Sequence, residues 1–407
     1  MELQVIHILL GKANPNRMNG VNKMVNSLAE HQAILGKDIT IWGITKNLIH
    51  DYPQRTYKTK LFKDKGKLSV SIELRIAIEL LANEYVIFHL HGGFIPQFYP
   101  IAKLLVKHQV SYVFTPHGAF NTVAMQRSQF KKKIYIKLIE SYLVKHAKHV
   151  HLIGESEITG TQEIFGVVPY QLIPNGQDSI VESSLPDSKN GNSIPVFGSV
   201  PYQLIKNGQD SIADTSLPNS KNGNSVPVFG FVGRLDMHTK GLDTLLKGFA
   251  ALLSKTGKNS ELWLIGDGLD KAKLEKLAQN LHIAKQMKFL GAQYGTEKDE
   301  LVKQFDFLCL VSRNEGLPAV VLEAASAGIP AIVSKETNLE SYIEKNNAGF
   351  VTEDNTINGV TAVLIAAIKC IKEKKNFQLG QNAIKMVRKD FNWSVIAKEH
   401  LFTYEIA

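Results

Sequence analysis

The sequence predicts an α/β protein built from two doubly wound domains in tandem. A length of 407 residues is too great for one compact core and fits two domains of roughly 150 to 200 residues. Hydrophobic residues make up 44% and charged residues 21%, which excludes a disordered tail, a coiled coil and a collagen-like fibre. Short β-branched or apolar runs alternate with helical stretches, the pattern of parallel sheets covered by helices.

Each half of the chain contains five candidate strands. In the first half they are Val5–Leu10, Ile39–Ile44, Tyr85–Leu90, Tyr112–Thr115 and His149–Ile153. After the first of these, apolar residues with a 3.6-residue period predict a helix over about 21–35, which Gly36 ends. In the second half the candidates are Val228–Val232, Leu262–Ile265, Met287–Leu290, Phe307–Val311 and Ala331–Val333. We therefore expect a first domain over 1–167 and a second over 226–390.

A tandem repeat lies between the two halves. Val168–Gly198 and Val200–Gly230 are identical at 25 of 31 aligned positions. The unit is rich in Pro, Asn, Gly and Ser, and two copies are too few for a solenoid. We interpret residues 168–225 as an interdomain linker with a duplicated 32-residue period, because longer loops add little to the cost of closure.

From the sequence we expect no disulfide framework, no structural metal site, no signal peptide and no transmembrane segment. Cys309 and Cys370 are 61 positions apart with no metal-ligand spacing nearby, so neither a disulfide framework nor a structural metal site is expected. The start MELQVIHILL lacks the basic region of a signal peptide, and the longest mostly apolar stretch, Ala319–Val333, is too short to span a bilayer. These features predict a cytoplasmic protein.

The net charge of +9 is concentrated in the first half. Residues 1–168 contain 21 Lys and Arg against 12 Asp and Glu, and the rest contains 26 of each. The excess gathers in Lys58–Lys67 and in Gln129–His149, where Phe130, Ile134, Leu138 and Tyr142 alternate with lysines at helical spacing. The second stretch fits a solvated helix face or an anionic membrane surface, and no motif supports nucleic-acid binding.

The segment SRNEGLPAVVLEAASAGIP, residues 312–330, has the strongest functional signal. A strand ends near Val311, and a helix begins at about Pro318. Glu315 then lies at the carboxyl end of a strand, where open α/β sheets bind ligands, and Glu323 lies within the helix. Two acids at this spacing can contact two ends of an extended ligand, while the helix start attracts an anion.

A second signal lies between Phe229 and Leu246. A strand leads into Gly233 and Arg234, and a turn with Lys240 and Gly241 precedes the next helix. Arg offers a bidentate fork and Lys a point charge, a pair suited to neutralising a diphosphate.

Together these motifs resemble the retaining nucleotide-sugar glycosyltransferases of the GT-B fold, family 4 (glycosyl transferases group 1). The resemblance is carried by GR and KG in the segment above, by the GDG turn Gly266–Gly268, and by E-x7-E within EGLPAVVLEAASAGIP. It extends to Asn19–Gly20 after the first strand and to Thr115–Gly118, which reads TPHG. It implies two Rossmann-like domains facing a cleft, with a last helix over about 391–407 that crosses back onto the first domain.

The resemblance also implies a role for each matching residue. Glu323 matches the acid that binds the ribose of the donor, Glu315 the acid near its sugar, and His117 the histidine beside that sugar. Arg234 and Lys240 match the pair on the donor diphosphate. The implied catalytic residues are Glu315, His117, Arg234 and Lys240, and the implied donor-binding residues are Gly20, Gly233, Arg234, Lys240, Glu315, Gly316, Leu317 and Glu323.

We therefore expect a retaining glycosyltransferase that moves a sugar from a nucleotide-sugar to a glycan or a lipid-linked acceptor, of the kind used in bacterial surface polysaccharide and lipopolysaccharide biosynthesis. No DxD-like cluster appears, so we expect no cofactor and no metal requirement. The alternative is a cytoplasmic two-domain sugar-binding protein without catalysis. Gly266–Gly268 lacks the third glycine of a dinucleotide loop, and His89 and His91 fit the cleft, a turn or the core.

Overall fold

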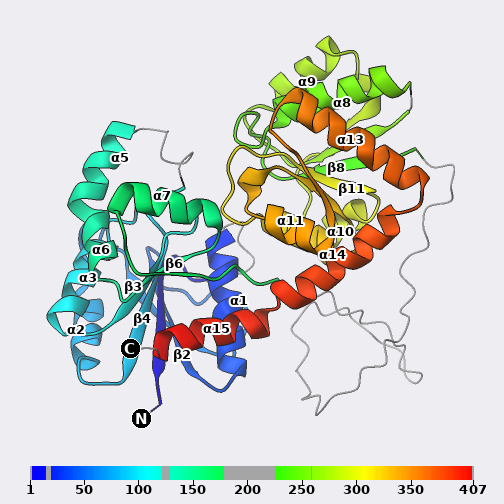
Figure 1. Ribbon diagram of the computed structural model, residues 1–407. Coiled ribbons are helices and arrows are strands. Elements are labelled where there is room, and N and C mark those ends of the chain that lie inside the picture. The colour runs from blue at the N-terminus through cyan, green and yellow to red at the C-terminus, as the bar shows by residue number, and fades with distance from the viewer. Residues whose placement is uncertain (1, 15–19, 122–128, 178–225, 258, 406–407) are drawn as a thin grey trace, which may run out of the picture. The chain divides into compact units, whose positions relative to one another are not determined.

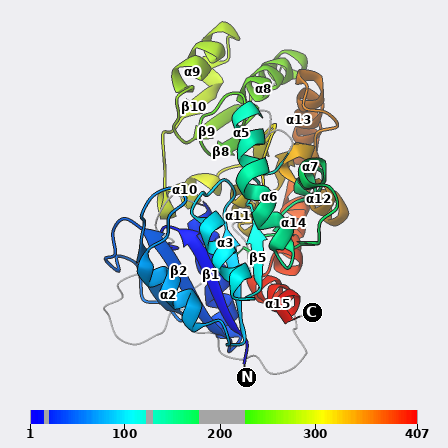
Figure 2. The ribbon, with the colours of Figure 1, turned by 90° about the vertical axis from the view of Figure 1, so that its left-hand side faces the viewer.

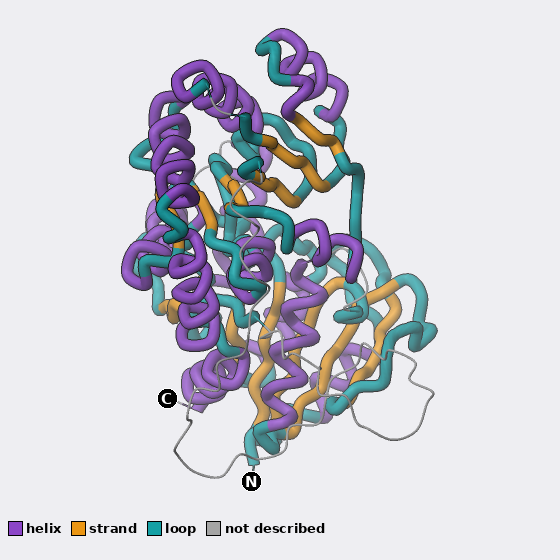
Figure 3. The backbone as a smooth tube through the Cα atoms, turned by 90° about the vertical axis from the view of Figure 1, so that its right-hand side faces the viewer, coloured by secondary structure: helices purple, strands orange, loops and turns teal. Residues whose placement is uncertain are grey.

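The computed structural model describes all residues except 1, 15–19, 122–128, 178–225, 258 and 406–407. It contains two parallel sheets, each flanked by helices (Figures 1 and 3). The α/β class predicted from alternating strands and helices is confirmed.

The first sheet has seven strands in the order β3-β2-β1-β4-β5-β6-β7. Its strands are β1 (Gln4–Leu10), β2 (Asp38–Thr45), β3 (Lys58–Lys63), β4 (Val86–His91), β5 (Tyr112–Thr115), β6 (Val150–Leu152) and β7 (Tyr170–Leu172). Its helices are α1 (Gly20–Ile34), α2 (Ile72–Leu80), α3 (Phe98–Lys107), α5 (Gln129–Tyr135), the π-helix η1 (Ile136–Glu140), α6 (Ser141–His146) and α7 (Glu155–Phe165). Figure 2 shows β1 and β2 beside α2 and α3.

Strand alternation sends the side chains of the first sheet into two separate cores. Ile6 and Ile8 of β1 belong to a core with α2, α3 and α6, whereas Val5 and Leu9 belong to a core with α1 and the C-terminal helix α15 (Trp393–Glu405). His7 lies between Val5 and Leu9 in the sequence, so its side chain is on the α1 and α15 face. In β4, Ile87 shares this face, and the alternation adds His89 and His91 to it.

The second sheet has six strands in the order β10-β9-β8-β11-β12-β13. The strands are β8 (Val228–Val232), β9 (Glu261–Ile265), β10 (Met287–Phe289), β11 (Phe307–Leu310), β12 (Ala331–Val333) and β13 (Gly349–Val351). The helices are α8 (Leu242–Thr256), α9 (Lys271–Asn280), α10 (Gly295–Val302), α11 (Ala319–Ser326), α12 (Glu340–Asn346), α13 (Ile357–Lys372) and α14 (Asn376–Asp390), with the 3-10 turns η2 (Ala284–Gln286) and η3 (Lys335–Thr337). The buried apolar side chains of this region form one continuous core.

The start of the repeat belongs to the first sheet. Strand β7 pairs with β6, and the next residues reach the C-terminal segment, where the Gln177 backbone N–H donates to the Phe391 carbonyl at 2.7 Å. A Cβ on Gly176 would lie 2.3 Å from the Trp393 ring, so only glycine fits there. The predicted linker began at residue 168, and the structure includes residues 168–177 in the first sheet and its connection instead. Residues 178–225 lie outside the described part of the chain.

Ten strands were predicted and ten are present within one or two residues of the expected ends. The prediction missed β3, β7 and β13. Helix α15 packs on α1 through Trp393, Ile396, Ala397, Leu401 and Tyr404. No helix among the described residues is long and apolar enough to cross a bilayer.

Candidate active site

Lys240, Glu315 and Ser312 form the centre of the site. The Lys240 Nζ lies 2.5 Å from Glu315 Oε1, and the Ser312 hydroxyl donates to the same oxygen at 2.6 Å. The side chains of Lys240 and Glu315 are only 19% and 12% exposed, so little water competes for this pair. A cation and a carboxylate that were predicted from separate motifs are therefore in direct contact.

The backbone at two strand ends positions this pair. Glu315 follows β11, and Lys240 precedes α8, whose first turn begins after Gly241. Gly241 has φ +64, and a Cβ there would lie 2.0 Å from the Val311 carbonyl oxygen. Only glycine allows the loop before α8 to approach the end of β11 so closely.

Asn338 and Asn121 hold the loop that carries Glu315. Asn338 Nδ2 donates to the Glu315 carbonyl at 3.0 Å and to the Gly316 carbonyl at 2.6 Å. Asn121 Nδ2 donates to the Asn314 side chain and, at 3.3 Å, to the Glu315 carbonyl. These bonds provide hydrogen-bond donors for the carbonyl groups of a loop that has no neighbouring strand, and so stabilise the loop.

Glu323 lies one turn into α11 between two lysines. Its Oε1 is 2.9 Å from Lys23 Nζ on α1, and its Oε2 is 2.6 Å from Lys298 Nζ on α10. Burial alone would raise the pKa of this carboxyl, but the two lysines outweigh burial and hold the pKa below its usual value. Glu323 is therefore ionised at neutral pH and able to accept hydrogen bonds from hydroxyl groups.

Arg234 stands apart from the Lys240 pair. It is 67% exposed, and the partner found for its guanidinium group is Asp236, at 3.2 Å. Gly233, just before it, has φ +152 and donates its N–H to the Ile265 carbonyl at 2.9 Å. The structure thus leaves most of the Arg234 fork open to solvent, without bringing it to Glu315.

His117 follows β5 in a backbone conformation that is uncommon for a residue with a side chain. Its φ is +53, and Gly118 after it has φ +79. A buried carboxylate stabilises this turn, because Glu157 accepts from the Gly118 N–H and, at 2.9 Å, from the Ile153 N–H. Burial raises the pKa of Glu157 to about 7, although the two hydrogen bonds act in the opposite direction and lower it. Strain of this kind is concentrated at functional sites.

Gly118 connects the His117 turn with the Glu315 loop. A Cβ on Gly118 would lie 3.3 Å from the Gly316 Cα, so both glycines allow close approach of the two backbones. Leu317 is half-buried against the core of the second sheet. Gly20 is the first residue of α1, and a Cβ there would meet no atom within 4 Å. The fold therefore does not require glycine at position 20.

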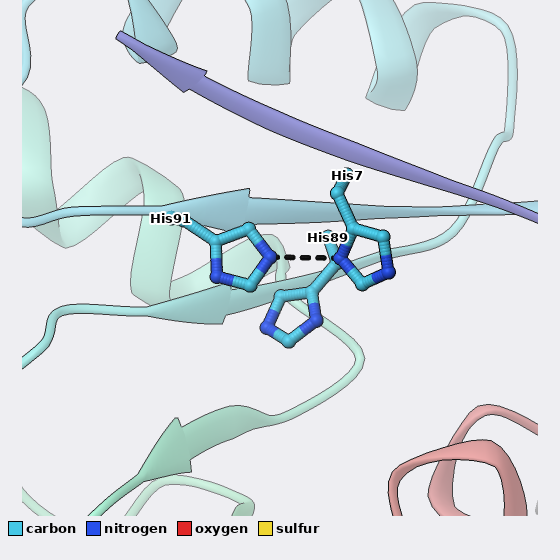
Figure 4. Close-up of side chains that lie close together, drawn as sticks. All are labelled: His7, His89 and His91. Atoms are coloured by element: carbon cyan, nitrogen blue, oxygen red, sulfur yellow. Dashed lines mark hydrogen bonds between the residues drawn. The ribbon is translucent and has the colours of Figure 1, made fainter. Parts of the chain in front are cut away.

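The sequence predicts a place in the cleft, in a turn or in the core for His89 and His91. The structure shows that both are buried. Together with His7 they bring three imidazole rings to adjacent parts of β1 and β4, as Figure 4 shows. The ring centroids of His89 and His91 are 3.9 Å apart, and those of His7 and His91 are 5.1 Å apart. His91 Nδ1 also lies 3.2 Å from His117 Nε2, so this buried group reaches the site.

Sequence reasoning missed several residues around the site. They are Lys23, Lys298, Ser312, Asn121, Asn338, Glu157 and His7. Ser312 is the first residue of the 312–330 motif, and Lys23 and Asn121 lie three residues after Gly20 and Gly118. Lys298, Asn338 and Glu157 are single polar residues far from any motif, so nothing in the local sequence indicates them. His7 and His91 did have a local signal. Along their strands they alternate in step with apolar core residues, His7 with Val5 and Leu9, and His91 with Ile87, so burial of both side chains could have been predicted.

Two family models match the chain. The model described as "Glycosyl transferases group 1" matches residues 214–386, and that described as "Glycosyltransferase Family 4" matches residues 18–179. Among curated relatives, N-acetyl-alpha-D-glucosaminyl L-malate synthase of Bacillus anthracis is 26% identical over 166 residues, covering 40% of this chain and 42% of the relative. The lipopolysaccharide core biosynthesis glycosyltransferase LpsE of Rhizobium meliloti is 27% identical over 120 residues, 30% of this chain and 33% of that protein. The chain thus matches less than half the length of these relatives.

Solved structures share the fold over the whole chain. Sucrose-phosphate synthase of Thermosynechococcus elongatus superposes with a TM-score of 0.69 at 17% identity, covering 99% of this chain and 98% of that one. HepE of Anabaena, in complex with UDP and glucose, superposes with a TM-score of 0.66 at 16% identity, covering 98% of both chains. WaaG, a glycosyltransferase involved in lipopolysaccharide biosynthesis, gives a TM-score of 0.60 at 16% identity, covering 99% of this chain and all of WaaG. One glycosyltransferase family model thus matches each half of the chain, and the solved structures show that the chain has the two-domain fold of GT-B glycosyltransferases.

Proposed function

We propose that the protein is a retaining glycosyltransferase that transfers a sugar from a nucleotide-sugar to a glycan or lipid-linked acceptor in bacterial surface polysaccharide biosynthesis. The observation that carries the proposal is the Lys240–Glu315 contact of 2.5 Å, which joins the two motifs at the carboxyl ends of parallel strands. LpsE, the relative named for lipopolysaccharide core biosynthesis, supports the same pathway class.

The donor diphosphate would lie against Lys240 and Arg234. Breaking the anomeric bond produces an oxocarbenium-like centre and a diphosphate leaving group. Lys240 is held by Glu315, and Arg234 has an open fork, so both can stabilise the developing negative charge without a metal ion. Gly233, which has no side chain and a positive φ, would allow the diphosphate to approach the backbone there.

The sugar and the ribose of the donor would contact the other predicted site residues. Glu315, with Gly316 and Leu317 after it, would face the sugar, and His117 would lie beside it. Glu323 would accept hydrogen bonds from the ribose hydroxyls, in competition with Lys23 and Lys298. Gly20 at the start of α1 has open space around it, which allows a phosphate to approach the backbone.

A donor panel tests the activity. The protein is incubated with UDP-, GDP- and ADP-sugars and with lipid extracts as acceptors, and release of the nucleoside diphosphate is measured together with donor binding by calorimetry. We expect one donor class to bind and to turn over, and proton NMR of the product to show the anomeric configuration of the donor. An inverted product overturns the retaining mechanism. Donor or sugar binding without turnover on any acceptor favours the non-catalytic sugar-binding alternative, and no binding overturns both.

The acceptor proposal rests on the helical column formed by α5, η1 and α6, which Figures 1 and 2 show as continuous. Ile134 and Leu138, one turn apart, are 46% and 65% exposed, and Lys133 and Lys137 are exposed directly beside them. Exposed aliphatic side chains next to lysines fit the interface of an anionic bilayer. A solvated helix face would not need the two aliphatic residues.

Vesicle sedimentation tests this surface. We expect the protein to pellet with anionic but not neutral vesicles at low salt, and to be released at high salt. The variant Lys133→Glu with Lys137→Glu should lose this binding, whereas Lys369→Glu with Lys372→Glu on α13 should retain it. Absence from both pellets at low salt removes the membrane proposal and leaves the transferase proposal intact.

A further inference from the structure

A cluster of buried polar side chains connects α1 and α15 with the His117 turn. Its members are Gln32, His7, His89, His91, Thr115, His151, His400 and Tyr404, all buried. Burial lowers the pKa of His7 and His151 to about 4, and those of His89 and His91 well below the usual value. These rings are therefore neutral at pH 7, and each has one N–H donor and one bare nitrogen acceptor.

The direction of one hydrogen-bond chain follows from the carbonyl group at its end. The Ile173 carbonyl can only accept, so His151 donates from Nε2, 2.7 Å away. His151 Nδ1 must then accept from the Thr115 hydroxyl at 2.8 Å. Because that single proton is used, Thr115 Oγ1 accepts from His89 Nε2 at 2.5 Å. His89 Nδ1 in turn accepts from the Tyr404 hydroxyl at 2.6 Å.

The Gln32 amide lies beside the Tyr404 end of this first chain. The Tyr404 hydroxyl gives its only proton to His89, so its oxygen offers lone pairs to other neighbours. Burial raises the pKa of the Tyr404 phenol, and the neighbouring Gln32 side chain lowers it. Gln32 Nε2 is buried without a hydrogen-bond partner among the described residues. Gln32 Oε1 is the atom that lies 2.7 Å from His7 Nε2.

A second chain runs from Gln32 to His117. Gln32 Oε1 only accepts, so His7 carries its proton on Nε2. His7 Nδ1 accepts from His91 Nε2 at 2.9 Å, the bond drawn in Figure 4. His91 Nδ1 then accepts from His117 Nε2 at 3.2 Å, with the two rings stacked at 5.4 Å. This leaves His117 with a bare Nδ1.

We propose that Gln32, His7 and His91 are positioning residues that hold His117 as its Nε2–H tautomer, so that Nδ1 accepts a hydrogen bond from a hydroxyl group of the transferred sugar. The inference rests on the proposed function, which provides the sugar. Burial lowers the pKa of His117 to about 3, so the ring does not supply a proton at neutral pH. His117 Nδ1 therefore acts as a hydrogen-bond acceptor. Gln32, three hydrogen bonds away along the chain, determines which nitrogen of His117 is the acceptor.

A metal ion is the competing use of the same rings. His7, His89 and His91 each offer a nitrogen within 4.8 Å of the other two. Both ring nitrogens of all three already have hydrogen-bond partners among the described residues. A metal would have to break several of these bonds and separate the 2.9 Å nitrogen pair of His7 and His91, so the geometry favours the hydrogen-bond chain.

Nitrogen NMR of the protein with ¹⁵N-labelled histidine tests the chain without any substrate. We expect the Nε2–H tautomer for His7, His91 and His117, and trans-hydrogen-bond nitrogen–nitrogen couplings for the pairs His7–His91 and His91–His117. An Nδ1–H signal from any of the three overturns the proposal. So does stoichiometric Zn²⁺ in the purified protein together with loss of the couplings.

Three variants separate positioning from structure. Gln32→Leu removes the terminal acceptor, so His117 should show mixed tautomers and turnover should fall about tenfold, the loss of one hydrogen bond, while affinity for the nucleoside diphosphate alone is unchanged. Gln32→Glu retains an acceptor and should retain the tautomer and the turnover. His400→Phe, in the same cluster but outside the chain, is the matched control and should change neither.

The outcomes of the two proposals are distinguishable. If no donor is turned over, the transferase proposal fails while the tautomers and couplings can still be measured. If Gln32→Leu turns over its donor like the wild type with an unaltered His117 tautomer, the positioning role is overturned and the transferase proposal stands.

Discussion

The two sheets carry polar chemistry in opposite ways. At the second sheet the functional candidates are charged and form ion pairs; Lys240 and Glu315 lie in loops at strand ends, and Glu323 lies in the first turns of α11. At the first sheet the polar groups are neutral, lie within the strands and form hydrogen-bond chains under α1 and α15. Charged groups need partial contact with water, so they lie in loops or in the first turns of a helix, whereas neutral imidazoles can be buried once each nitrogen has a partner.

Acidification should produce the largest effect and should act through the first sheet. In the unfolded chain these histidines titrate near pH 6.5, whereas in the folded protein burial lowers the pKa of His7, His149 and His151 to about 4. Below pH 6.5 the unfolded state binds more protons, so stability is lost as pH falls toward 4, by up to about 1.4 kcal/mol per pH unit for each group.

Two buried glutamates oppose this effect, because burial raises the pKa of Glu157 to about 7 and of Glu140 to about 8. Their contribution increases as pH falls, but burial lowers the pKa of seven histidines, which outweigh the two glutamates: His7, His89, His91, His117, His149, His151 and His400. We expect the free energy of unfolding in urea to fall by at least about 3 kcal/mol between pH 7.5 and 5.5. Fluorescence of Trp42 in the first core, with the other tryptophans replaced by Phe, reports the change; an unchanged or higher midpoint at pH 5.5 would contradict it.

Lys240→Ala should give the next largest effect and tests the charged side of the comparison. It removes a cation from the diphosphate and leaves Glu315 without its ion-pair partner, so turnover should fall by about 10- to 100-fold. The fold should persist, as circular dichroism can show. Lys335→Ala is the matched control, since Lys335 is half-exposed and pairs at 3.5 Å with Glu340. Equal kinetics in the two variants would remove Lys240 from the site.

A pair of glycine substitutions compares the two sheets directly. Gly241→Ala combines φ +64 with a clash against the Val311 carbonyl and should lower the free energy of unfolding by about 2 kcal/mol or more. Gly20→Ala meets no atom within 4 Å and should leave stability unchanged. If Gly20→Ala still weakens donor binding in calorimetry, a close approach of the donor to this backbone is supported.

Glu323→Ala should lower turnover by about tenfold, the cost of one charge-assisted hydrogen bond to the ribose. Glu323→Gln should retain part of it, because the amide oxygen still accepts. Glu300→Ala, which removes an exposed acid from α10, serves as the control. Wild-type kinetics in a folded Glu323→Ala protein would rule out the ribose assignment.

The smallest effect is expected from deleting one period, Ile180–Ser211. Both sheets and β7 lie outside the deleted residues, so melting temperature and donor affinity should stay at wild-type values. Aggregation or loss of donor binding in the shortened protein would mean that the second copy has a structural role.

The strands were predictable because ten of them are short apolar or β-branched runs bounded by turn residues. The exceptions have physical reasons. β3 (Lys58–Lys63) is an edge strand in which three of the six residues are lysines, so its sequence has the character of a basic run. Lysine on an edge strand protects against pairing with other chains. β7 is exposed along its length, and β13 has only three half-buried residues, so neither shows the burial that marks a strand.

The site residues were predictable only where neighbouring residues in the sequence also indicate a turn or a helix start. Glu315, Lys240 and Glu323 come with the glycines, prolines and helix starts that position them. The two lysines that bind Glu323 come from other helices. Lys23 on α1 is 300 residues away in the sequence and Lys298 on α10 is 25 residues away, so the motif around Glu323 does not indicate them. The histidine chain required the pairing of β1 with β4, where His7 lies opposite His89, and register between distant strands cannot be obtained from one sequence.

The repeat has a consequence for inheritance. The described structure uses the beginning of the first copy, in β7, and the end of the second, in β8. The residues that form β7 and the next turn, Tyr170–Gln177, recur as Tyr202–Gln209 with one difference, Pro174 against Lys206. Replication slippage between the copies would therefore add or remove whole periods in frame while leaving one strand-forming segment for each sheet. We expect natural variants of this gene to differ in length here by multiples of 32 codons, with both sheets unaffected.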